Sequence, residues 1–260
     1  MTILAAEGLS LTLGDVTILD RVTASFARGA VTAVLGPNGA GKSTLLACLA
    51  GLRAADSGVV MLDGMARTTI DRRDLARRIG FLPQTGDVHW DIDVATLVGL
   101  GRFAHRGRWG ETPADRAAVS AAIAATDIAR FSTRIVNSLS GGERARVLLA
   151  RVLAGTPEWL LADEPLANLD PAHQLDGLDC LRGVAAGGAG VVVVLHDLNH
   201  AARIADQILL MRGGHVVAQG SPDAVLTADL IAETYGVATF GGVTPHGQRF
   251  IIPTHRVDGR

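Results

Sequence analysis

The segment GPNGAGKST, residues 36–44, constrains the fold of this chain more than any other segment. The apolar runs AVTAVL before it and TLLACLA after it predict a strand, a glycine-rich loop and a helix. Gly36, Gly41, Lys42 and Ser43 stand in the spacing G-x-x-x-x-G-K-S. In such a loop, backbone N–H groups surround nucleotide phosphates, the lysine neutralises charge, and the serine hydroxyl is a ligand for Mg²⁺. A tight turn without a ligand is the structural alternative, but the flanking strand and helix favour phosphate binding.

The rest of the chain alternates short apolar runs with helical patterns, which predicts an α/β fold with a mainly parallel sheet. Residues 1–35 instead predict an antiparallel β subdomain, with turns at Gly-Asp, Asp-Arg and Arg-Gly. A mostly helical stretch, about 92–155, predicts an inserted lobe within a single domain, 1–260, that has a short C-terminal tail, 236–260. The other predicted elements are helix 42–50 ending at Gly51, strand 59–62, helix 72–78, strands 79–82 and 159–163, helix 172–185, strand 190–195, helix 198–205, strands 207–212 and 215–219, a Ser-Pro-capped helix from 222, and strand-like pieces at 237–240 and 248–252.

Composition excludes some classes of function. The chain has 260 residues, 48% of them hydrophobic and only 19% charged, which is typical of a packed protein. A formal net charge of −2 provides no general attraction to nucleic acid or to anionic lipid. No leader pattern opens the chain, and the aliphatic run at 191–195 is far shorter than a membrane span. Cys48 and Cys180 lie in apolar helical contexts and are expected to be reduced, as in a cytosolic protein.

A second anion-binding helix start is predicted at LSGGERARVLLARVLAG, residues 139–155. Ser140 can cap this helix, and Glu143, three residues later, can complete a capping box. The free N–H groups and the dipole of such a start favour an anion. The chain therefore has two phosphate-binding elements, about a hundred residues apart.

Polar side chains follow three predicted strands. Asp163 and Glu164 end EWLLADE, where acidic residues lie at the ligand-binding edge of an open sheet. Asp163 is expected to hold Mg²⁺, and Glu164 to activate an attacking water. Gln84 and His196 end two further strands, and each is either a site residue or a structural residue on spacing alone. Asp170, before Pro171, is expected to cap a helix.

Together these segments resemble the ATP-binding subunit of ABC transporters, from about residue 3 to residue 235. Gly36–Thr44 is similar to the Walker A motif, Gln84 to the Q-loop and Leu139–Glu143 to the LSGGE signature. LLADE is similar to Walker B, Asn168–Asp170 to the D-loop and His196 to the H-loop. The resemblance implies a P-loop NTPase core and ATPase activity with ATP and Mg²⁺. The ATP-binding residues that it implies are Gly36, Pro37, Asn38, Gly39, Ala40, Gly41, Lys42, Ser43, Thr44, Ser140, Gly141, Gly142, Glu143 and Asp170. The catalytic residues implied are Glu164, His196, Gln84 and Lys42, and those near the metal are Ser43, Gln84 and Asp163.

The resemblance also implies partners. Two copies would pack head to tail, so that Ser140, Gly141 and Gly142 of one contact the ATP held by Lys42 of the other. The lobe and the Gln84 loop would contact a membrane permease, which places the chain at the cytoplasmic face of the inner membrane. A periplasmic or lipoprotein binding protein would be an indirect partner, and nucleic acid would not be one. The segments EWLLADEPLANLDPAHQLD and VVVVLHDLNHAARIAD look most like importers of iron complexes, namely ferric siderophores, haem or the related cobalamin group.

Two positions depart from the family pattern. Leu13 stands where an aromatic residue usually stacks on adenine, and Ala145 stands where glutamine is frequent. Three alternatives remain open: an importer of another substrate, a soluble ABC ATPase such as one for Fe–S cluster assembly, and a dimerisation module without turnover. The unaltered Glu164 and His196 disfavour the last.

Overall fold

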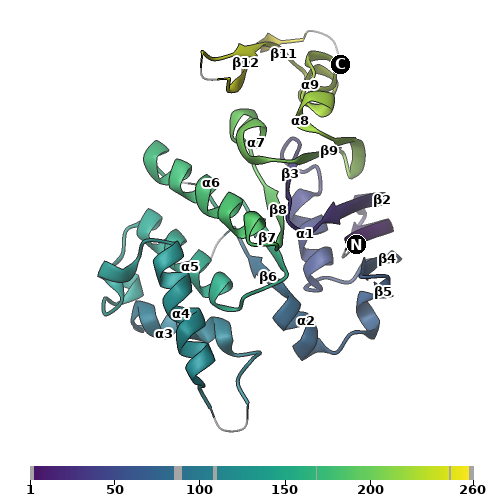
Figure 1. Cartoon of the computed structure of the whole chain (residues 1–260). Coiled ribbons are helices and arrows are strands. Elements are labelled where there is room, and N and C mark those ends of the chain that lie inside the picture. Colours follow the sequence, from purple (N-terminus) through teal and green to yellow (C-terminus); the bar gives the residue numbers. More distant parts are fainter. Residues whose placement is uncertain (1–2, 85–89, 108–109, 168, 246, 258–260) are drawn as a thin grey trace.

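The computed structural model describes residues 3–84, 90–107, 110–167, 169–245 and 247–257. Its largest sheet has six strands in the order β10-β9-β3-β8-β7-β6. These are β3 (Val31–Leu35), β6 (Ile79–Leu82), β7 (Trp159–Asp163), β8 (Gly190–Val194), β9 (Gln207–Arg212) and β10 (His215–Gly220). All neighbours are parallel except the pair β9 and β10. Every residue of β3, β7 and β8 is buried, because helices or a second sheet cover both faces. The predicted mainly parallel sheet is confirmed (Figure 1).

The N-terminal region forms a second, antiparallel sheet in the order β2-β1-β4-β5. It contains β1 (Ile3–Leu13), β2 (Val16–Ala27), β4 (Ser57–Leu62) and the short β5 (Met65–Ala66). The predicted antiparallel subdomain is therefore confirmed, but the turn predicted at Asp20-Arg21 is wrong. There β2 runs on through an irregularity, in which Arg21 has φ 47° and the Asp20 N–H bonds the Gly214 carbonyl at 3.0 Å.

Helix α1 (Lys42–Ala50) lies between the two sheets and ends at Gly51, as predicted. Leu45, Leu46 and Leu49 are fully buried in the core that joins both sheets. Helices α6 (Pro171–Ala186) and α7 (Leu198–Ile204) contribute to the core on the opposite face of the large sheet. Helix α2 (Arg72–Arg78) leads from the antiparallel sheet into β6.

Three helices between β6 and β7 pack on one another at one side of the molecule (Figure 1). They are α3 (Val94–Gly99), α4 (Pro113–Ala125) and α5 (Gly141–Ala154), joined by the 3₁₀ turns η2 (Leu100–Arg102), η3 (Ala129–Phe131) and η4 (Val136–Ser138). The name lobe is used below for residues 92–155. Its apolar residues belong to the same core as those of the sheet, since Val98 and Val147 share a cluster with Val193.

The C-terminal region contains two helices where one was predicted from residue 222. Helix α8 (Pro222–Val225) ends after one turn, and Thr227 caps a new helix, α9 (Ala228–Tyr235). The two predicted strand-like pieces form a hairpin of β11 (Val237–Val243) and β12 (Arg249–Arg256). Asn199 of α7 holds this hairpin by bonding both the N–H and the carbonyl of Ile251, at 2.7 and 3.3 Å.

Two absences concern the described part of the chain. No helix there is long and apolar enough to cross a membrane. Cys48 is buried and Cys180 partly buried, and neither is disulfide-bonded, in line with the expected reduced state. Burial raises the pKa of both thiols.

Candidate functional site: a phosphate-binding loop beside three strand ends

The glycine-rich loop connects β3 to α1 in a conformation that requires glycine at two positions. Gly36 has φ +149°, and a Cβ there would stand 2.1 Å from the Met211 carbonyl oxygen. Gly41 has φ +92°, and a Cβ there would stand 2.6 Å from the Ile18 carbonyl oxygen. The buried Lys42 ammonium donates to the carbonyl oxygens of Gly36 and Pro37, at 2.7 and 2.9 Å. The loop is therefore held tightly between β9 and β2, with its lysine folded against it.

Residues from three neighbouring strand ends meet beside this loop. The Gln84 amide, after β6, donates to Oε2 of Glu164 at 2.7 Å. His196, after β8, places Nε2 at 2.5 Å from Oε1 of the same carboxylate. Glu164, directly after β7, has φ 50°, a conformation that is sparsely populated for residues with a side chain and is frequent at functional sites. The structure thus brings together three residues that the sequence placed at separate strand ends.

Asp163, the last residue of β7, contacts the phosphate-binding loop through Ser43. The Ser43 hydroxyl donates to Oδ1 of Asp163 at 3.1 Å, and the carboxylate is buried. Burial raises the pKa of Asp163, which the hydrogen bond from Ser43 opposes. Burial likewise lowers the pKa of Lys42, and the Glu164 and Asp163 carboxylates partly offset this effect.

A cleft of about 500 Å³ opens over these groups. Its lining contains Asn38, Gly39, Ala40, Gly41, Lys42, Ser43, Thr44, Gln84, Glu164 and His196. Ile18 of β2 also lines it, and the sequence analysis missed this residue. Leu13 lies half-exposed at the end of β1, one hairpin turn before β2.

An oxygen of the cleft lining, that of Ser43, and the Asp163 carboxylate hydrogen-bonded to it fit a magnesium ion. Mg²⁺ is typically held by one or two protein oxygens together with waters and substrate phosphates. The Ser43 hydroxyl and the Asp163 carboxylate supply such a pair next to the loop. Among the described residues, no group of three or more His, Cys, Asp or Glu side chains forms a metal site of the all-protein kind.

The predicted second anion site is at the start of α5. Its capping box is confirmed: Ser140 Oγ accepts from the Glu143 N–H at 3.3 Å, and the Ser140 N–H donates to Glu143 Oε2 at 2.9 Å. The hydrogen bond from the Ser140 N–H lowers the pKa of Glu143. Ser140 and Gly141 are exposed, and a Cβ on Gly141 would meet open space. No packing within the described chain therefore requires a glycine there.

The start of α5 does not line the cleft over the phosphate-binding loop. None of Ser140, Gly141, Gly142 or Glu143 is among the described residues of that lining. Asp170 also acts elsewhere: it caps α6 by accepting from the His173 N–H at 3.0 Å, as predicted. Its neighbour Asn168 lies outside the described residues.

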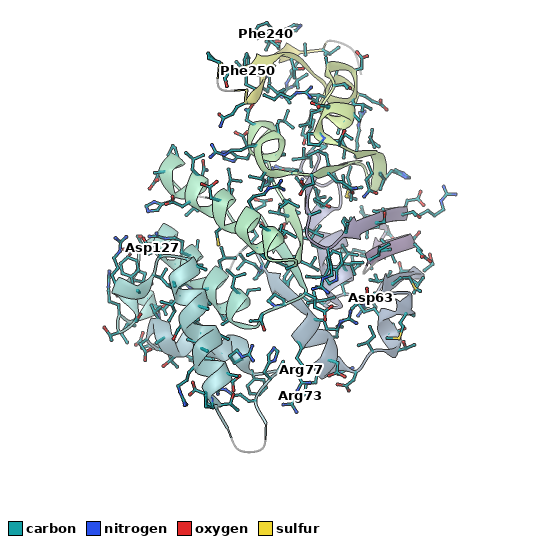
Figure 2. The ribbon with its side chains drawn as sticks, viewed as in Figure 1. Asp63, Arg73, Arg77, Asp127, Phe240 and Phe250 are labelled. Atoms are coloured by element: carbon teal, nitrogen blue, oxygen red, sulfur yellow. The ribbon has the colours of Figure 1, made fainter. Side chains whose placement is uncertain are left out.

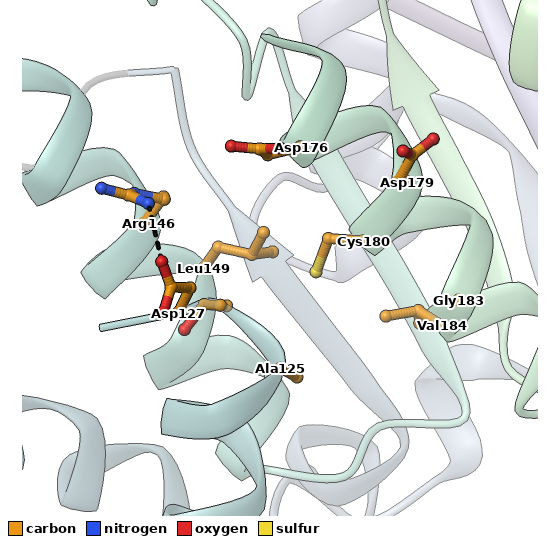
Figure 3. Close-up of a pocket in the computed structure, with 11 residues that line it drawn as sticks. Ala125, Asp127, Arg146, Leu149, Asp176, Asp179, Cys180, Gly183 and Val184 are labelled. Carbon is orange, nitrogen blue, oxygen red and sulfur yellow. Dashed lines mark ion pairs between the residues drawn. The ribbon is translucent and has the colours of Figure 1, made fainter. Parts of the chain in front are cut away.

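A second cavity, of about 660 Å³, lies between the lobe and α6 (Figure 3). Leu149 and Ala125 face Cys180 and Val184 across it, and Arg146 pairs with Asp127 at 3.9 Å on its edge. It contains none of the residues predicted for the nucleotide site.

Comparison with known proteins agrees with this geometry. A family model described as ABC transporter matches residues 19–167. Hemin import ATP-binding protein HmuV of Pseudomonas entomophila is 42% identical over 254 residues, which cover 95% of this chain and 96% of that protein. Ferric enterobactin transport ATP-binding protein FepC of Escherichia coli is 40% identical over 238 residues, which cover 90% of this chain and 87% of that protein.

Other matches are partial in length or more distant. Cobalamin import ATP-binding protein BtuD of Halobacterium salinarum is 41% identical over 243 residues; these cover 93% of this chain but only 61% of that protein. Among solved structures, a transporter described as metal-chelate type, in an inward-facing conformation, has a TM-score of 0.84 at 25% identity and covers 98% of both chains. A dimeric bacterial ABC transporter cassette has a TM-score of 0.76 at 27% identity, covering 84% of this chain and 98% of its own.

An ATPase fold with a phosphate-binding loop, an acidic strand end and a separate LSGGE helix defines the class of protein. The chain belongs to the ABC transporter family, as an ATP-binding subunit.

Proposed function

We propose that this chain hydrolyses ATP in a head-to-tail pair of identical copies and thereby drives an importer. One observation carries the proposal: the phosphate-binding loop and three strand ends form one cleft, while the exposed start of α5 lies outside it. The free N–H groups at the start of α5 can bind an anion, and this anion has to come from outside the chain's own cleft. In a pair of copies related by a two-fold axis, the ATP bound in each cleft supplies the anion for the α5 start of the other copy. The resemblance to a dimeric cassette supports this arrangement.

Within the cleft, each residue has a proposed role. The loop of residues 36–44 surrounds the phosphates, and Lys42 binds their β and γ oxygens. Ser43, Asp163 and Gln84 hold Mg²⁺, which supplies charge neutralisation at the phosphates when bound. Glu164 takes the proton of the attacking water, while Gln84 and His196 hold its carboxylate in place. The whole chain, 1–260, is proposed to act as one domain with the lobe as its inserted part and 236–260 as its tail.

The dimer is tested by mixing two inactive variants, Lys42→Ala and Ser140→Ala. Each alone is expected to lack turnover, because both of its composite sites carry one lesion. In a mixed pair one site carries both lesions and the other carries none. Random mixing at equal amounts makes half the pairs mixed, so activity recovers to roughly a quarter of the unmodified level. Phosphate release measures the recovered activity.

The control is Lys42→Ala mixed with the double variant that carries both substitutions, and this mixture should stay inactive. If the mixture of the two single variants also stays inactive, composite sites are refuted.

The proposed cargo is an iron complex of the siderophore or haem type, or the related cobalamin. The names of three relatives, for hemin, ferric enterobactin and cobalamin, support this class. Because the ATP-binding subunit does not contact cargo, a permease that receives the lobe and the loop after Gln84 is also proposed. Residues 85–89 of that loop lie outside the described part of the chain.

The proposed location is the cytoplasmic face of the inner membrane, where the permease holds the subunit and a periplasmic or lipoprotein binding protein delivers the cargo. Deleting the gene should abolish growth of the host when one of these complexes is its sole source of iron or of cobalamin. Unchanged growth on all three complexes would favour another substrate.

Leu13→Tyr is expected to tighten ATP binding. Stacking of a base on an aromatic ring contributes about 1–3 kcal/mol, which corresponds to roughly fivefold or more in affinity. Leu13 is half-exposed at the end of β1, so a larger ring has room there. Titration with a fluorescent ATP analogue measures the change, and Leu52→Tyr, at an exposed leucine just after α1, is the control. Unchanged affinity would show that adenine does not contact this position.

A further inference from the structure

Helix α2 is fixed to the nucleotide-binding core at its C-terminal end. The Arg78 guanidinium bonds Glu158, just before β7, at 3.0 Å and also bonds Asp63 in the β4–β5 turn. These contacts join α2 to both sheets, so the position of α2 follows the position of the core.

The same helix reaches the lobe through two other arginines. Nε of Arg73 and Nε of Arg77 both donate to the carbonyl oxygen of Ala104, at 2.8 and 2.9 Å. Arg73 also donates to the carbonyl oxygen of Arg106. Figure 2 shows both side chains on the lower part of the molecule, between α2 and the lobe. One carbonyl thus accepts from two guanidinium groups, which uses both of its lone pairs.

The segment that receives these bonds is attached to the far end of α5. Arg102 and Asp115 are both buried, and Nε of Arg102 donates to Oδ1 of Asp115 at 2.8 Å. The Arg102 guanidinium also donates to the Ala154 carbonyl and the Thr156 hydroxyl, each at 3.1 Å. The ring of His105 bonds the Gly155 carbonyl at 2.9 Å. A Cβ on Gly101 would stand 1.9 Å from the Arg151 carbonyl oxygen, so η2 lies directly against the last turn of α5.

Helix α5 carries this attachment to its other end. It has 14 residues and is about 21 Å long, with Ser140 at its start. Apolar packing holds the lobe on the core, but such packing is not directional, whereas hydrogen bonds fix an orientation. A continuous path of hydrogen bonds and close backbone contact therefore runs from α2, through 101–106, to the helix whose start faces the second copy.

We propose that Arg73 and Arg77 are positioning residues for the start of α5. They hold the lobe in the orientation in which Ser140, Gly141 and Gly142 meet the ATP of the other copy. The inference rests on the proposed function, because it assumes the head-to-tail pair. Neither arginine lines the cleft, so ATP binding by a single copy does not depend on them.

The test uses chains that carry Glu164→Gln, which are expected to accumulate as ATP-bound dimers. Adding Arg73→Ala and Arg77→Ala is expected to weaken ATP-dependent dimerisation roughly tenfold, from the loss of the three hydrogen bonds to the lobe, measured by sedimentation velocity over a protein dilution series. Affinity of the dilute monomer for a fluorescent ATP analogue should stay unchanged, as should the melting temperature to within a few degrees. Arg73→Lys with Arg77→Lys, which keeps charge and donors, should restore part of the dimerisation.

Arg72→Ala is the matched control, since Arg72 is an exposed neighbour on α2 whose side chain makes no hydrogen bond or ion pair in the described part of the chain. The inference is overturned if the double alanine variant dimerises like its parent, or if it loses monomer affinity for the analogue in the same proportion. If Glu164→Gln alone stays monomeric with ATP, the head-to-tail pair itself is wrong and the inference falls with it.

Discussion

Glu164→Gln is expected to lower the rate of ATP hydrolysis by about a hundredfold to ten-thousandfold, the usual contribution of a general base. The substitution keeps the shape of the side chain and removes the charge that attracts a proton from water. Binding of ATP should persist, because the phosphate-binding loop and Lys42 are unchanged. The charge of Glu164 also adds to the raised pKa of Asp163, so its removal eases ionisation of that carboxyl group.

Two measurements check this expectation. Phosphate release gives the rate, and size-exclusion chromatography with light scattering gives the oligomeric state with and without ATP. The variant should remain dimeric in ATP, since turnover no longer removes the γ-phosphate that joins the copies. Glu7→Gln, an exposed glutamate on β1, is the control and should hydrolyse ATP normally. Normal turnover by the Glu164 variant would assign the proton transfer to another group.

Lys42→Ala is expected to weaken ATP binding about a hundredfold or more. A hydrogen bond between an ammonium and a charged acceptor contributes about 1.5–3 kcal/mol, and this lysine is proposed to make such bonds to two phosphate groups. The substitution also removes the donor that now bonds the Gly36 and Pro37 carbonyls.

Isothermal titration with ATP measures the affinity, and circular dichroism shows whether the fold persists. Arg53→Ala, which removes an exposed cation just after α1, is the control and should bind ATP as before. Lys42→Arg should also bind weakly, because a planar guanidinium does not replace a compact ammonium in a narrow loop. Retained affinity in Lys42→Ala would mean that the loop backbone alone holds the phosphates.

Much of the site was predictable because its determinants are local in sequence. The spacing of Gly36, Gly41 and Lys42 specifies the loop, and Ser140 with Glu143 specifies a helix start. The meeting of strand ends followed from the parallel sheet, in which carboxyl ends share an edge. What remained hidden depends on contacts distant in sequence. The continuation of β2 through Asp20 requires the Gly214 carbonyl, 194 residues away.

Other features were missed for the same reason. Ile18 reaches the cleft only because β2 passes beside Gly41. The bonds from Arg73 and Arg77 to Ala104 join segments 27–31 residues apart, and nothing in the arginine-rich helical pattern distinguishes them from solvated surface charges. The helix predicted from residue 222 is divided in the structure because Thr227 caps a new helix. This cap lies inside the apolar segment from which one continuous helix was predicted.

Lys42 is the single lysine among the 24 cationic Lys and Arg residues of the chain. The other 23 are arginines, whose guanidinium groups amine-directed acylating reagents leave untouched. Apart from the backbone terminus, the whole protein thus offers one primary amine, buried in the loop where the phosphates are proposed to lie. Mass spectrometry of an acylated sample would therefore count, molecule by molecule, the fraction of chains whose nucleotide cleft was open when the reagent was added.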